Sequence, residues 1–331
     1  MALFIPGVST PTTPLGFGCS QLMGGISRKD SVALLRTAYD AGIRHFDTAP
    51  SYGYGLAEGV LGEALRAKRP NITITTKYGL RPPRNRRALD VLRAVARPVV
   101  RHLPGAKACL ARAAGGLTTR ARFSAEELRT SIDASLTALG TDYIDILLLH
   151  EAVVADLSDD LLEALEHGVA VGKIRTFGVG SEATSAHAIH RTDRRFCPVL
   201  QFDWSVLDGA VPSHPGSFQI THRSLFENFT RLHAWLAANP ATAAGWSNAL
   251  DRDVADAAVL ARLMLAAARA ANPLGITLFS SRNADNIRKN ATLLLCEDDL
   301  GAGASFARLV ARDGPTAGQQ GTSPRIKASA A

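Results

Sequence analysis

Residues 124–150 read SAEELRTSIDASLTALGTDYIDILLLH, a predicted helix followed at once by a predicted strand. Ser124 stands three residues before Glu127, which is the spacing of a capping box at a helix N-terminus. Apolar residues then recur at helical spacing as far as Gly140, and these are Leu128, Ile132, Leu136 and Leu139. The apolar run Tyr143–His150 is typical of a buried strand. The stretch therefore predicts one helix–strand unit of an α/β fold with parallel strands.

Seven further apolar runs have the same strand character and alternate with helical patterns along the chain. They are Leu15–Gly18, His45–Ala49, Ile72–Tyr78, Ile174–Ser181, Pro198–Trp204, Ser217–His222 and Ile276–Arg282. After the first run, Ser27 opens an apolar helical stripe that stops at Gly42, so a cap and a C-terminal glycine bound this helix. Eight such strands with crossover helices predict a closed (β/α)8 TIM barrel, in which ligands bind at the C-terminal ends of the strands.

An open doubly wound sheet is the competing architecture. Sheets of that kind commonly bind dinucleotides through a Gly-x-Gly-x-x-Gly loop after the first strand. Here Gly16, Gly18, Gly24 and Gly25 have the wrong spacing for that loop. We therefore favour the barrel.

Three stretches depart from a regular barrel. Residues 81–122 are too long for an ordinary loop and form an insertion after the third strand. Residues 205–216 are rich in proline and glycine and leave no room for a crossover helix. Residues 224–250 hold an extra helix, Leu225–Ala238, before the expected barrel helix Val254–Ala270. We expect a single barrel domain over residues 1–311 and a disordered tail over residues 312–331.

The composition of the 331-residue chain, 46% hydrophobic and 20% charged, is that of a folded globular protein. No apolar run reaches the ~20 residues that a membrane span needs, and residues 1–20 lack the pattern of a signal peptide. The four cysteines include no C-x-x-C pair, which predicts neither a disulfide framework nor a zinc site. We therefore expect a cytoplasmic protein with no membrane partner and no metal ion.

The net charge of +7 is concentrated in one segment. Residues 81–122 hold 11 Lys or Arg and a single acid, Asp90, whereas the rest of the chain is slightly acidic. One interpretation is a solvated amphipathic helix. The other is a lid that recruits an anionic or carrier-bound substrate to the mouth of the barrel. Nucleic-acid binding is disfavoured, because aromatic residues for base stacking are nearly absent from the segment.

Four polar residues fall at or just past successive strand ends, and in a barrel they would face one mouth. They are Asp47, Tyr52, Lys77 and His150. Reduction of a carbonyl requires a proton for the developing alkoxide, and a phenol is a poor acid at pH 7 unless it is tuned. A lysine ammonium nearby lowers the phenol pKa, a carboxylate holds the lysine, and a histidine can orient the carbonyl oxygen. The set therefore predicts a site for carbonyl reduction.

Each of these residues also has a structural interpretation when it is taken alone. Asp47 could be a turn residue, Lys77 a solvated loop charge, and His150 a core histidine. Tyr54 competes with Tyr52 for the role of the acid. A Schiff-base aldolase that uses Lys77 is the chemical alternative, but nothing in the sequence places Lys77 in the apolar pocket that would lower its pKa.

The segment from Ala41 to Gly53, AGIRHFDTAPSYG, resembles the signature of the aldo-keto reductases. Residues 136–150, LTALGTDYIDILLLH, and residues 172–180, GKIRTFGVG, look like later motifs of that family. The resemblance implies a (β/α)8 barrel that binds NADP(H), less often NAD(H), without a Rossmann motif. The loop PSYGYGL at residues 50–56 is similar to that of sugar-oxidising members such as the galactose and fucose dehydrogenases.

The same resemblance implies the roles of the four polar residues. Tyr52 would be the general acid, Lys77 and Asp47 its tuning pair, and His150 the residue that orients the substrate. Residues 280–290, SSRNADNIRKN, resemble the family's phosphate and adenine motif. The cofactor-binding residues carried over are Gln201, Ser181, Ser280, Ser281, Arg282, Asn286 and Asn290.

NADP(H) is the favoured cofactor, because Arg282 could pair with its 2′-phosphate. Two departures from the family pattern also concern the cofactor. NAD(H) stays an alternative because residues 278–280 replace the usual Ile-Pro-Gly or Ile-Pro-Lys-Ser opening. The family's Ser-Asn pair appears here as Gly180-Ser181. The aromatic residue on which the nicotinamide stacks has three candidates, namely Phe218, His222 and Trp204.

The sequence as a whole predicts an NAD(P)-dependent oxidoreductase. It would transfer a hydride between the nicotinamide cofactor and an aldehyde or ketone, or a sugar or other secondary alcohol. Its partner would be a small-molecule substrate, and the protein would be a monomer or a weak homo-oligomer. A nicotinamide-nucleotide-binding sensor or scaffold subunit with little turnover is the alternative from another class, favoured by the lost Ser-Asn pair.

Overall fold

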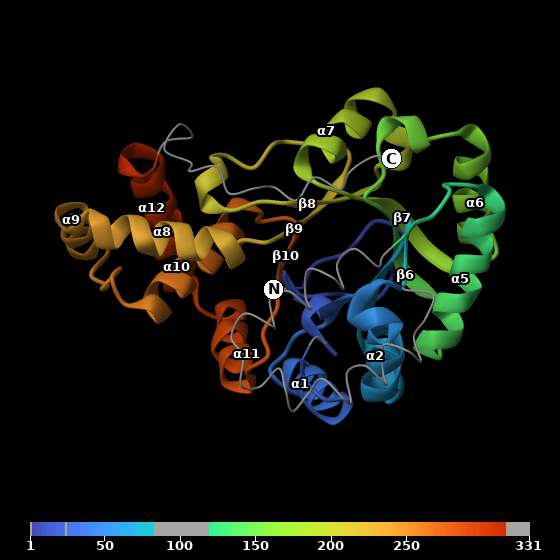
Figure 1. Ribbon diagram of the computed structural model, residues 1–331, viewed down its shortest axis with the longest axis horizontal. Helices are drawn as coiled ribbons and strands as arrows, with labels where there is room; N and C mark the ends of the chain where they lie inside the picture. Colours follow the sequence, from blue (N-terminus) through green and yellow to red (C-terminus); the bar gives the residue numbers. More distant parts are fainter. Residues whose placement is uncertain (1, 24, 83–118, 316–331) are drawn as a thin grey trace. The chain divides into compact units, whose positions relative to one another are not determined.

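Eight parallel strands close into a barrel in the order β1-β10-β9-β8-β7-β6-β3-β2 (Figure 1). The structure is a computed structural model that describes residues 2–23, 25–82 and 119–315. The barrel strands are β1 (Leu15–Gly18), β2 (His45–Asp47), β3 (Thr73–Tyr78), β6 (Ile144–His150), β7 (Ile174–Gly180), β8 (Val199–Asp203), β9 (Phe218–His222) and β10 (Ile276–Phe279). The closed order confirms the predicted (β/α)8 barrel and excludes the open doubly wound sheet.

The eight predicted strands are all present and differ from the predictions only at their ends. The second strand ends at Asp47 rather than Ala49, and the eighth ends at Phe279 rather than Arg282. Past Asp47 the chain begins to turn out of the ladder, although the amide of Thr48 still donates to the carbonyl of Thr75. The residues just past each strand therefore become loop residues at the barrel mouth.

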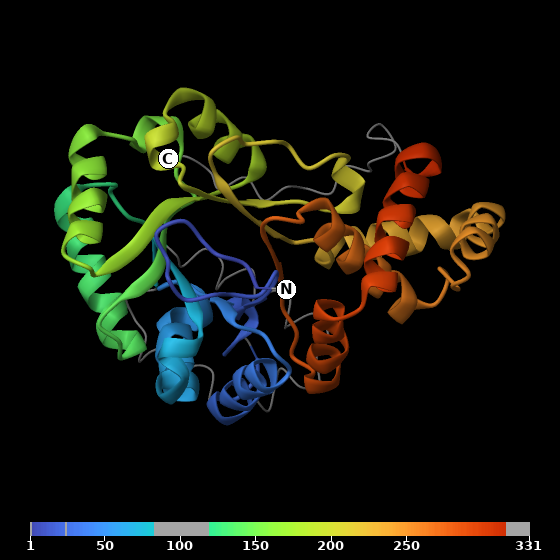
Figure 2. The ribbon, with the colours of Figure 1, turned by 180° about the vertical axis from the view of Figure 1, so that it is seen from behind.

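Among the described residues, six helices belong to the same compact unit as the barrel. They lie outside its strands (Figures 1 and 2). They are α1 (Arg28–Asp40), α2 (Ala57–Leu65), α5 (Ala125–Leu139), α6 (Asp159–Ala170), α7 (Ala183–Thr192) and α11 (Ala284–Ala291). The predicted caps are confirmed, because Ser27 accepts from the amide of Asp30 and Ser124 from that of Glu127. Gly140 ends α5 with a φ of 64°, a left-handed value that glycine adopts without a Cβ clash.

The N-terminal segment packs on the end of the barrel where the strands begin. Leu3 and Thr12 form an antiparallel bridge, and Leu3, Ile5 and Val8 join one buried cluster with barrel residues. The barrel members of that cluster are Ile146, Leu148, Val199, Phe218, Ile220, Ile276 and Leu278. Apolar packing at this end leaves the opposite mouth for polar chemistry.

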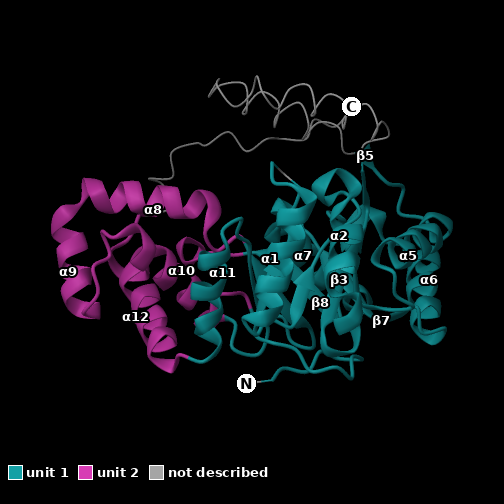
Figure 3. Ribbon diagram, turned by 90° about the horizontal axis from the view of Figure 1, so that it is seen from below, with its two compact units in different colours: residues 1–203, 213–222, 272–295 teal, residues 204–212, 223–271, 296–331 magenta. Residues whose placement is uncertain are grey.

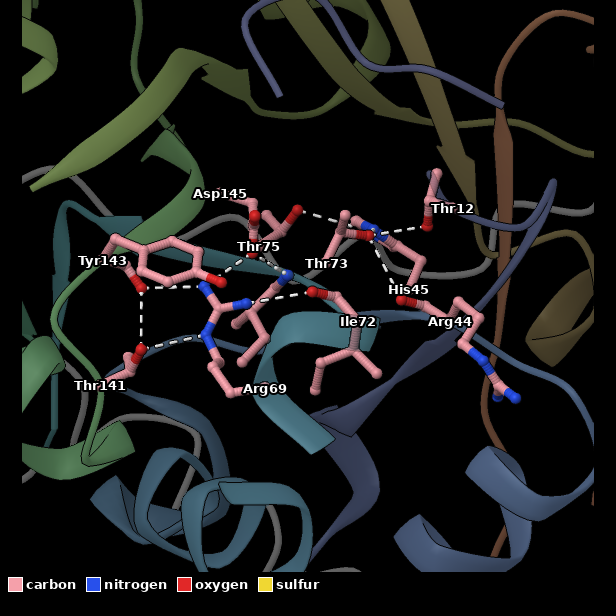
Figure 4. A network of polar contacts seen from close by, with 11 residues as sticks. Thr12, Arg44, His45, Arg69, Ile72, Thr73, Thr75, Thr141, Tyr143 and Asp145 are labelled. Carbon is pink, nitrogen blue, oxygen red and sulfur yellow. Dashed lines mark hydrogen bonds and ion pairs between the residues drawn. The ribbon is translucent and has the colours of Figure 1, made fainter. Parts of the chain in front are cut away.

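A polar network joins β2, β3 and β6 near their starts (Figure 4). The Arg69 guanidinium pairs with Asp145 at 2.7 Å and donates to the carbonyls of Ile72 and Tyr143. Asp145 also accepts from the amide of Ile74 at 2.8 Å. β2 and β6 end at Asp47 and His150, and β3 ends one residue after Lys77, so the network joins the strands that carry three of the predicted catalytic residues.

Within the barrel, the His45 imidazole bridges two threonines of β3 (Figure 4). Its Nδ1 lies 2.9 Å from Oγ1 of Thr73, and its Nε2 lies 3.3 Å from Oγ1 of Thr75. The Thr73 hydroxyl also lies 2.7 Å from that of Thr12. Burial lowers the pKa of His45 to about 4, so the ring is neutral at pH 7.

The chain divides into two compact units (Figure 3). The first, residues 1–203, 213–222 and 272–295, contains the whole barrel. The second, residues 204–212, 223–271 and 296–331, contains α8 (Phe226–Ala238), α9 (Pro240–Leu250), α10 (Ala257–Ala271) and α12 (Glu297–Asp313). Within the second unit, Asp299 pairs with Arg252 at 2.6 Å and with Arg262 at 2.5 Å. The single domain over residues 1–311 stays a prediction.

The second unit agrees with the sequence predictions in part. The extra helix α8 and the barrel helix α10 are confirmed within three residues, whereas α9 was not expected. Pro240 suggests a helix end, but proline is favourable at the first position of a helix, and α9 begins there. α12 runs to Asp313, two residues into the predicted tail, and residues 316–331 lie outside the described residues.

One connection behaves as predicted, and a second is described only at its base. Residues 205–216 hold the short 3-10 turn η6 (Val206–Asp208) and no crossover helix. After β3, the strands β4 (Leu80–Arg81) and β5 (Thr119–Arg120) pair antiparallel and form the base of the basic insertion. Residues 83–118 lie outside the described residues, so the helix and lid interpretations stay predictions. None of the helices described is long and apolar enough to cross a membrane.

Candidate active site

The ends of four strands carry polar side chains at the barrel mouth, staggered in register. Asp47 pairs with Thr75, two residues before Lys77, and Lys77 pairs with Leu148, two residues before His150, whereas His150 and Gln201 both pair with Gly180. Asp47, Lys77 and His150 are only 4%, 2% and 6% exposed. Charged groups covered to this extent need partners, and the partners show what the site is built to hold.

Asp47 holds the Lys77 ammonium. Lys77 Nζ donates to Oδ1 of Asp47 at 2.6 Å and to the carbonyl of Thr48 at 3.1 Å. The second carboxylate oxygen of Asp47 accepts from Nε2 of Gln201 at 2.7 Å. Both carboxylate oxygens therefore have donors, and the buried ammonium has a charge partner, as a stable buried ion pair requires.

Tyr52 begins the short turn η2 (Tyr52–Gly55) that follows β2. Gly53, Tyr54 and Gly55 have φ values of 56°, 60° and 87°, a left-handed run that glycine permits at two of the three positions. The turn carries the Tyr52 ring back to Lys77, whose Nζ lies 4.9 Å from the ring centroid. The structure thus supports Tyr52 over Tyr54 as the phenol beside the lysine.

Opposing effects act on the pKa values of Tyr52 and Lys77. Burial raises the pKa of the Tyr52 phenol, and the charge of Lys77 lowers it without cancelling the effect of burial. Burial disfavours the Lys77 ammonium, but Asp47 and Tyr52 together outweigh burial and raise the pKa of Lys77. At pH 7 the lysine is charged and the phenol is protonated. The prediction that Lys77 lowers the pKa of Tyr52 is correct. The expectation that the net pKa of Tyr52 is lowered is wrong, because burial desolvates the phenol.

His150 lies edge-on to Tyr52, with 5.8 Å between ring centroids and 84° between ring planes. Burial, together with the charges of Lys77 and His222, lowers the pKa of His150 well below its usual value. The imidazole is therefore neutral at pH 7 and can donate one hydrogen bond to a substrate oxygen. Its Nδ1 is buried and has no hydrogen-bond partner among the described residues.

This constellation of phenol, ammonium, carboxylate and imidazole lies within the part of the chain that a known family model matches. The model of the aldo/keto reductase family matches residues 14–208, more than half of the chain, including six barrel strands and all four side chains. The chain belongs to the aldo/keto reductase family.

Other aldo/keto reductases and related enzymes align with parts of the chain. It is 35% identical over 191 residues to a D-threo-aldose 1-dehydrogenase from Pseudomonas, an alignment that covers 54% of this chain and 53% of that protein. It is 36% identical over 218 residues to a pyridoxal 4-dehydrogenase from Microbacterium luteolum, covering 59% and 60%. The chain therefore spans little more than half the length of these relatives.

A solved aldo/keto reductase shares the fold. The enzyme from Klebsiella pneumoniae, crystallised in complex with NADP and acetate, superposes with a TM-score of 0.60. The superposition covers 93% of each chain at 20% sequence identity. At that identity the likeness shows a common barrel architecture and does not extend to individual contacts.

Two of the predicted cofactor residues of this aldo/keto reductase lie beside the four polar side chains described above. The Ser181 amide donates to the carbonyl of Gln201 at 3.1 Å, and the Ser181 hydroxyl donates to the carbonyl of Ala152 at 3.0 Å. A Cβ on Gly180 would lie 3.2 Å from Oε1 of Gln201. Glycine at position 180 therefore leaves space beside the Gln201 amide.

The other predicted cofactor residues follow β10, and they are Ser280, Ser281, Arg282, Asn286 and Asn290. The Ser280 hydroxyl donates to the carbonyl of Gly18 at 2.7 Å, which places Ser280 at the mouth, where Gly18 is level with Asp47. Arg282 is exposed and reaches toward the loop after β1, since a Cβ on Gly25 would lie 3.8 Å from its Nη1.

The N-terminus of α11 already has a cap. Asn283 accepts from the amides of Asp285 and Asn286 at 2.8 and 3.2 Å. Two of the amides that could bind a phosphate therefore have an acceptor within the protein. The Ser281 hydroxyl donates to the carbonyl of Asn283 at 3.3 Å, and Arg282 contributes the guanidinium of this segment. Asn290 lies one helix length away, in the last turn of α11.

One expectation for the stacking aromatic is wrong. Phe218 is the first residue of β9 and lies in the apolar cluster at the opposite end of the barrel, whereas His222 ends β9 at the mouth. The sequence also did not reveal the hydrogen bond between Gln201 and Asp47, because residues 154 positions apart meet only when the barrel closes. In the described part of the chain, no three His, Cys, Asp or Glu side chains are grouped to hold a metal ion.

Proposed function

We propose that the protein is an NAD(P)-dependent oxidoreductase that transfers a hydride between the nicotinamide and a small aldehyde or ketone, or a sugar or other secondary alcohol. The observation that carries the proposal is the position of the Tyr52 phenol, whose ring lies close to a charged lysine and to a neutral histidine. A proton donor, a group that stabilises its anion and a hydrogen-bond donor for the substrate oxygen are what carbonyl reduction requires.

Each of the four residues has a part in the proton chemistry. The neutral His150 donates a hydrogen bond that orients the substrate oxygen, and the phenol Oη of Tyr52 gives its proton to that oxygen. The resulting phenolate is stabilised by the ammonium of Lys77, which the Asp47 carboxylate keeps charged and in place. In the oxidative direction, the same phenolate accepts the proton of the alcohol.

The residues at the mouth fit a nicotinamide nucleotide. Gly180 leaves room beside the Gln201 amide, and Gly18 keeps the backbone of β1 open beside Ser280, where a Cβ would lie 2.7 Å from the serine hydroxyl. The bound cofactor would supply or accept the hydride. Gln201 and Ser181 would hold its amide end, and the segment from Ser280 to Asn290 its phosphates and adenine.

NADP(H) is the favoured cofactor, with NAD(H) as the alternative. The exposed Arg282 can form a charge-assisted hydrogen bond with a 2′-phosphate. The Klebsiella pneumoniae enzyme, which has the same fold, was crystallised with NADP. The capped N-terminus of α11 makes the guanidinium of Arg282, rather than bare helix amides, the group on which this preference depends.

The two relatives support a small polar substrate, since one is named for an aldose and the other for pyridoxal. The structure argues against the Schiff-base aldolase. Such an enzyme needs a neutral lysine amine as its nucleophile, whereas Lys77 is ion-paired with Asp47 at 2.6 Å and its pKa is raised.

Consumption of NADPH and NADH with a panel of aldehydes and sugars tests the proposal. Tyr52→Phe should lower kcat by about 10²- to 10⁴-fold and still bind the cofactor, because only the acidic hydroxyl is removed. Tyr54→Phe, two residues along the same turn, is the matched control and should stay within a few-fold of wild type. If wild type and Tyr52→Phe are equally inert while the cofactor binds, the chain is a nicotinamide-binding sensor or scaffold and the proposal fails.

A further inference from the structure

The residue after His150 has an unusual backbone conformation. Glu151 has a φ of 55°, in the left-handed region that residues with a Cβ rarely adopt. Its amide donates to the carbonyl of Gly180 at 2.9 Å, which ties it to the neighbouring strand β7. A glutamate in this conformation stays there only when surrounding contacts hold the backbone, and such positions cluster at functional sites.

His150 depends on that backbone for its orientation. A catalytic histidine is commonly held by a hydrogen bond to the ring nitrogen that faces away from the substrate. Here Nδ1 of His150 is buried without such a partner among the described residues. The direction of the ring is then set by the main chain at residues 150 and 151 and by the edge-on contact with Tyr52.

Arg120 supplies the second contact that holds this backbone. Its Nη2 donates to the carbonyl of Glu151 at 3.1 Å and also pairs with the carboxylate of Asp156. Asp156 in turn accepts from the amide of Val153 at 2.7 Å, at the start of the 3-10 turn η4 (Val154–Asp156). One guanidinium therefore fastens both ends of the loop that follows His150.

Arg120 is itself held close to the end of β3, the strand that carries Lys77. It lies in β5, opposite Leu80 of β4, directly after the strand that carries the lysine. Its guanidinium carbon lies 5.4 Å from the ring centroid of Phe123, and that ring packs edge-on against Tyr78 with 5.5 Å between centroids. The arginine therefore connects the end of β3 to the end of β6.

We propose that Arg120 is a positioning residue, which holds the left-handed backbone of Glu151 and thereby the orientation of His150. The inference rests on the proposed function, because it assigns the consequence to the substrate-orienting histidine. It gives one arginine of the basic segment a structural role, distinct from attraction of an anionic substrate.

The two roles predict different kinetics. Arg120→Gln removes the contacts with Glu151 and Asp156. If Arg120 is a positioning residue, the variant should have a kcat about 5- to 10-fold lower with little change in KM, equally at low and at high salt. Attraction of an anion would instead raise KM, and the effect would fade in ~0.5 M salt. Arg120→Lys separates them further, because it keeps the charge but lacks the planar fork that reaches two acceptors. Arg120→Lys should behave like Arg120→Gln if Arg120 is a positioning residue.

A second substitution, at Glu151, tests whether Arg120 acts on His150 through the backbone of Glu151. Asparagine adopts left-handed φ values more readily than glutamate. Adding Glu151→Asn to Arg120→Gln should therefore recover at least half of the lost kcat. Arg28→Gln is the matched control, since Arg28 is 49% exposed and ion-paired with Glu63, while Arg120 is 47% exposed. The control should leave kcat unchanged.

Hydrogen exchange provides a readout that does not depend on turnover. Arg120→Gln should raise the exchange of amides 151–156 about fivefold or more, and Arg28→Gln should not. If wild type has no oxidoreductase activity, the proposed function fails, and hydrogen exchange alone shows whether Arg120 holds the backbone of Glu151. Unchanged exchange, a salt-dependent rise in KM, wild-type kinetics in Arg120→Lys, or no recovery with Glu151→Asn would each overturn the assignment.

Discussion

The Lys77 ammonium and the Tyr52 ring lie 4.9 Å apart, measured from Nζ to the ring centroid. This separation couples the two groups, because Lys77 lowers the pKa of Tyr52 and Tyr52 raises the pKa of Lys77. The phenol is disfavoured as an anion by burial, and the lysine reduces that penalty. In the proposed mechanism, proton transfer from Tyr52 therefore depends on how firmly Asp47 keeps Lys77 charged.

Asp47→Asn should lower activity about 10²-fold and move the alkaline limb of the pH–rate profile to lower pH. The reason is that the buried Lys77 loses the carboxylate that raises its pKa, so it deprotonates at a lower pH than in wild type. The kcat/KM profile between pH 6 and pH 10 measures the shift. Asp133→Asn removes the carboxylate of an exposed pair with Lys173 and serves as control. An unshifted profile in Asp47→Asn would contradict this coupling.

His45 should make the protein less stable in mild acid. Its folded pKa of about 4 lies below the usual 6.5, so the unfolded state binds the proton more readily. The contribution is fully present above pH 6.5 and is lost as the pH falls toward 4, with about 2 kcal/mol lost between pH 7 and pH 5.

Urea unfolding at pH 7 and pH 5 measures this loss. His45→Gln should show a smaller decline in the free energy of unfolding than wild type, because the titrating group is gone. His167→Gln changes an exposed histidine on α6 and should decline like wild type. Equal declines in all three proteins would exclude His45 as the source.

Gly178 should tolerate no side chain. It lies in β7, and a Cβ there would overlap the carbonyl oxygen of Val199 on β8. Gly178→Ala should therefore lower the free energy of unfolding by about 1–3 kcal/mol or more. Gly245 lies within α9 with nothing near its Cβ position, so Gly245→Ala should raise stability by about 0.5–1 kcal/mol. Chemical unfolding of both variants distinguishes them, and a stable Gly178→Ala would refute the packing argument.

Arg69→Met should destabilise the protein by about 3–5 kcal/mol, since it leaves the Asp145 carboxylate buried without its cation (Figure 4). Arg69→Met with Asp145→Leu should recover part of that loss, because the unpaired charge is then removed as well. Lys173→Met breaks an exposed pair and should cost less than about 1 kcal/mol. Thermal unfolding midpoints give the comparison. A double variant no more stable than Arg69→Met would show that the pair itself is not the cause.

Much of the barrel could be predicted because its signals are local. The capping serines Ser27 and Ser124, the glycine after α5 and the apolar runs each act within a few residues, so patterns of hydrophobicity and turn chemistry show them directly. Strand ends were less predictable, because leaving the ladder depends on the neighbouring strand. α9 was missed because Pro240, read locally, marks an end as readily as a beginning.

The order of motifs along the chain was enough to identify the family and to select Asp47, Tyr52, Lys77 and His150. What those side chains do to one another required the closed barrel. The net pKa shift of Tyr52 depends on how deeply the phenol is covered, and the contacts of Gln201 with Asp47 and of Arg120 with Glu151 join residues far apart in sequence. Residue types and their spacing carry chemical capability, whereas desolvation and distance exist only once separate strands have been brought to one mouth.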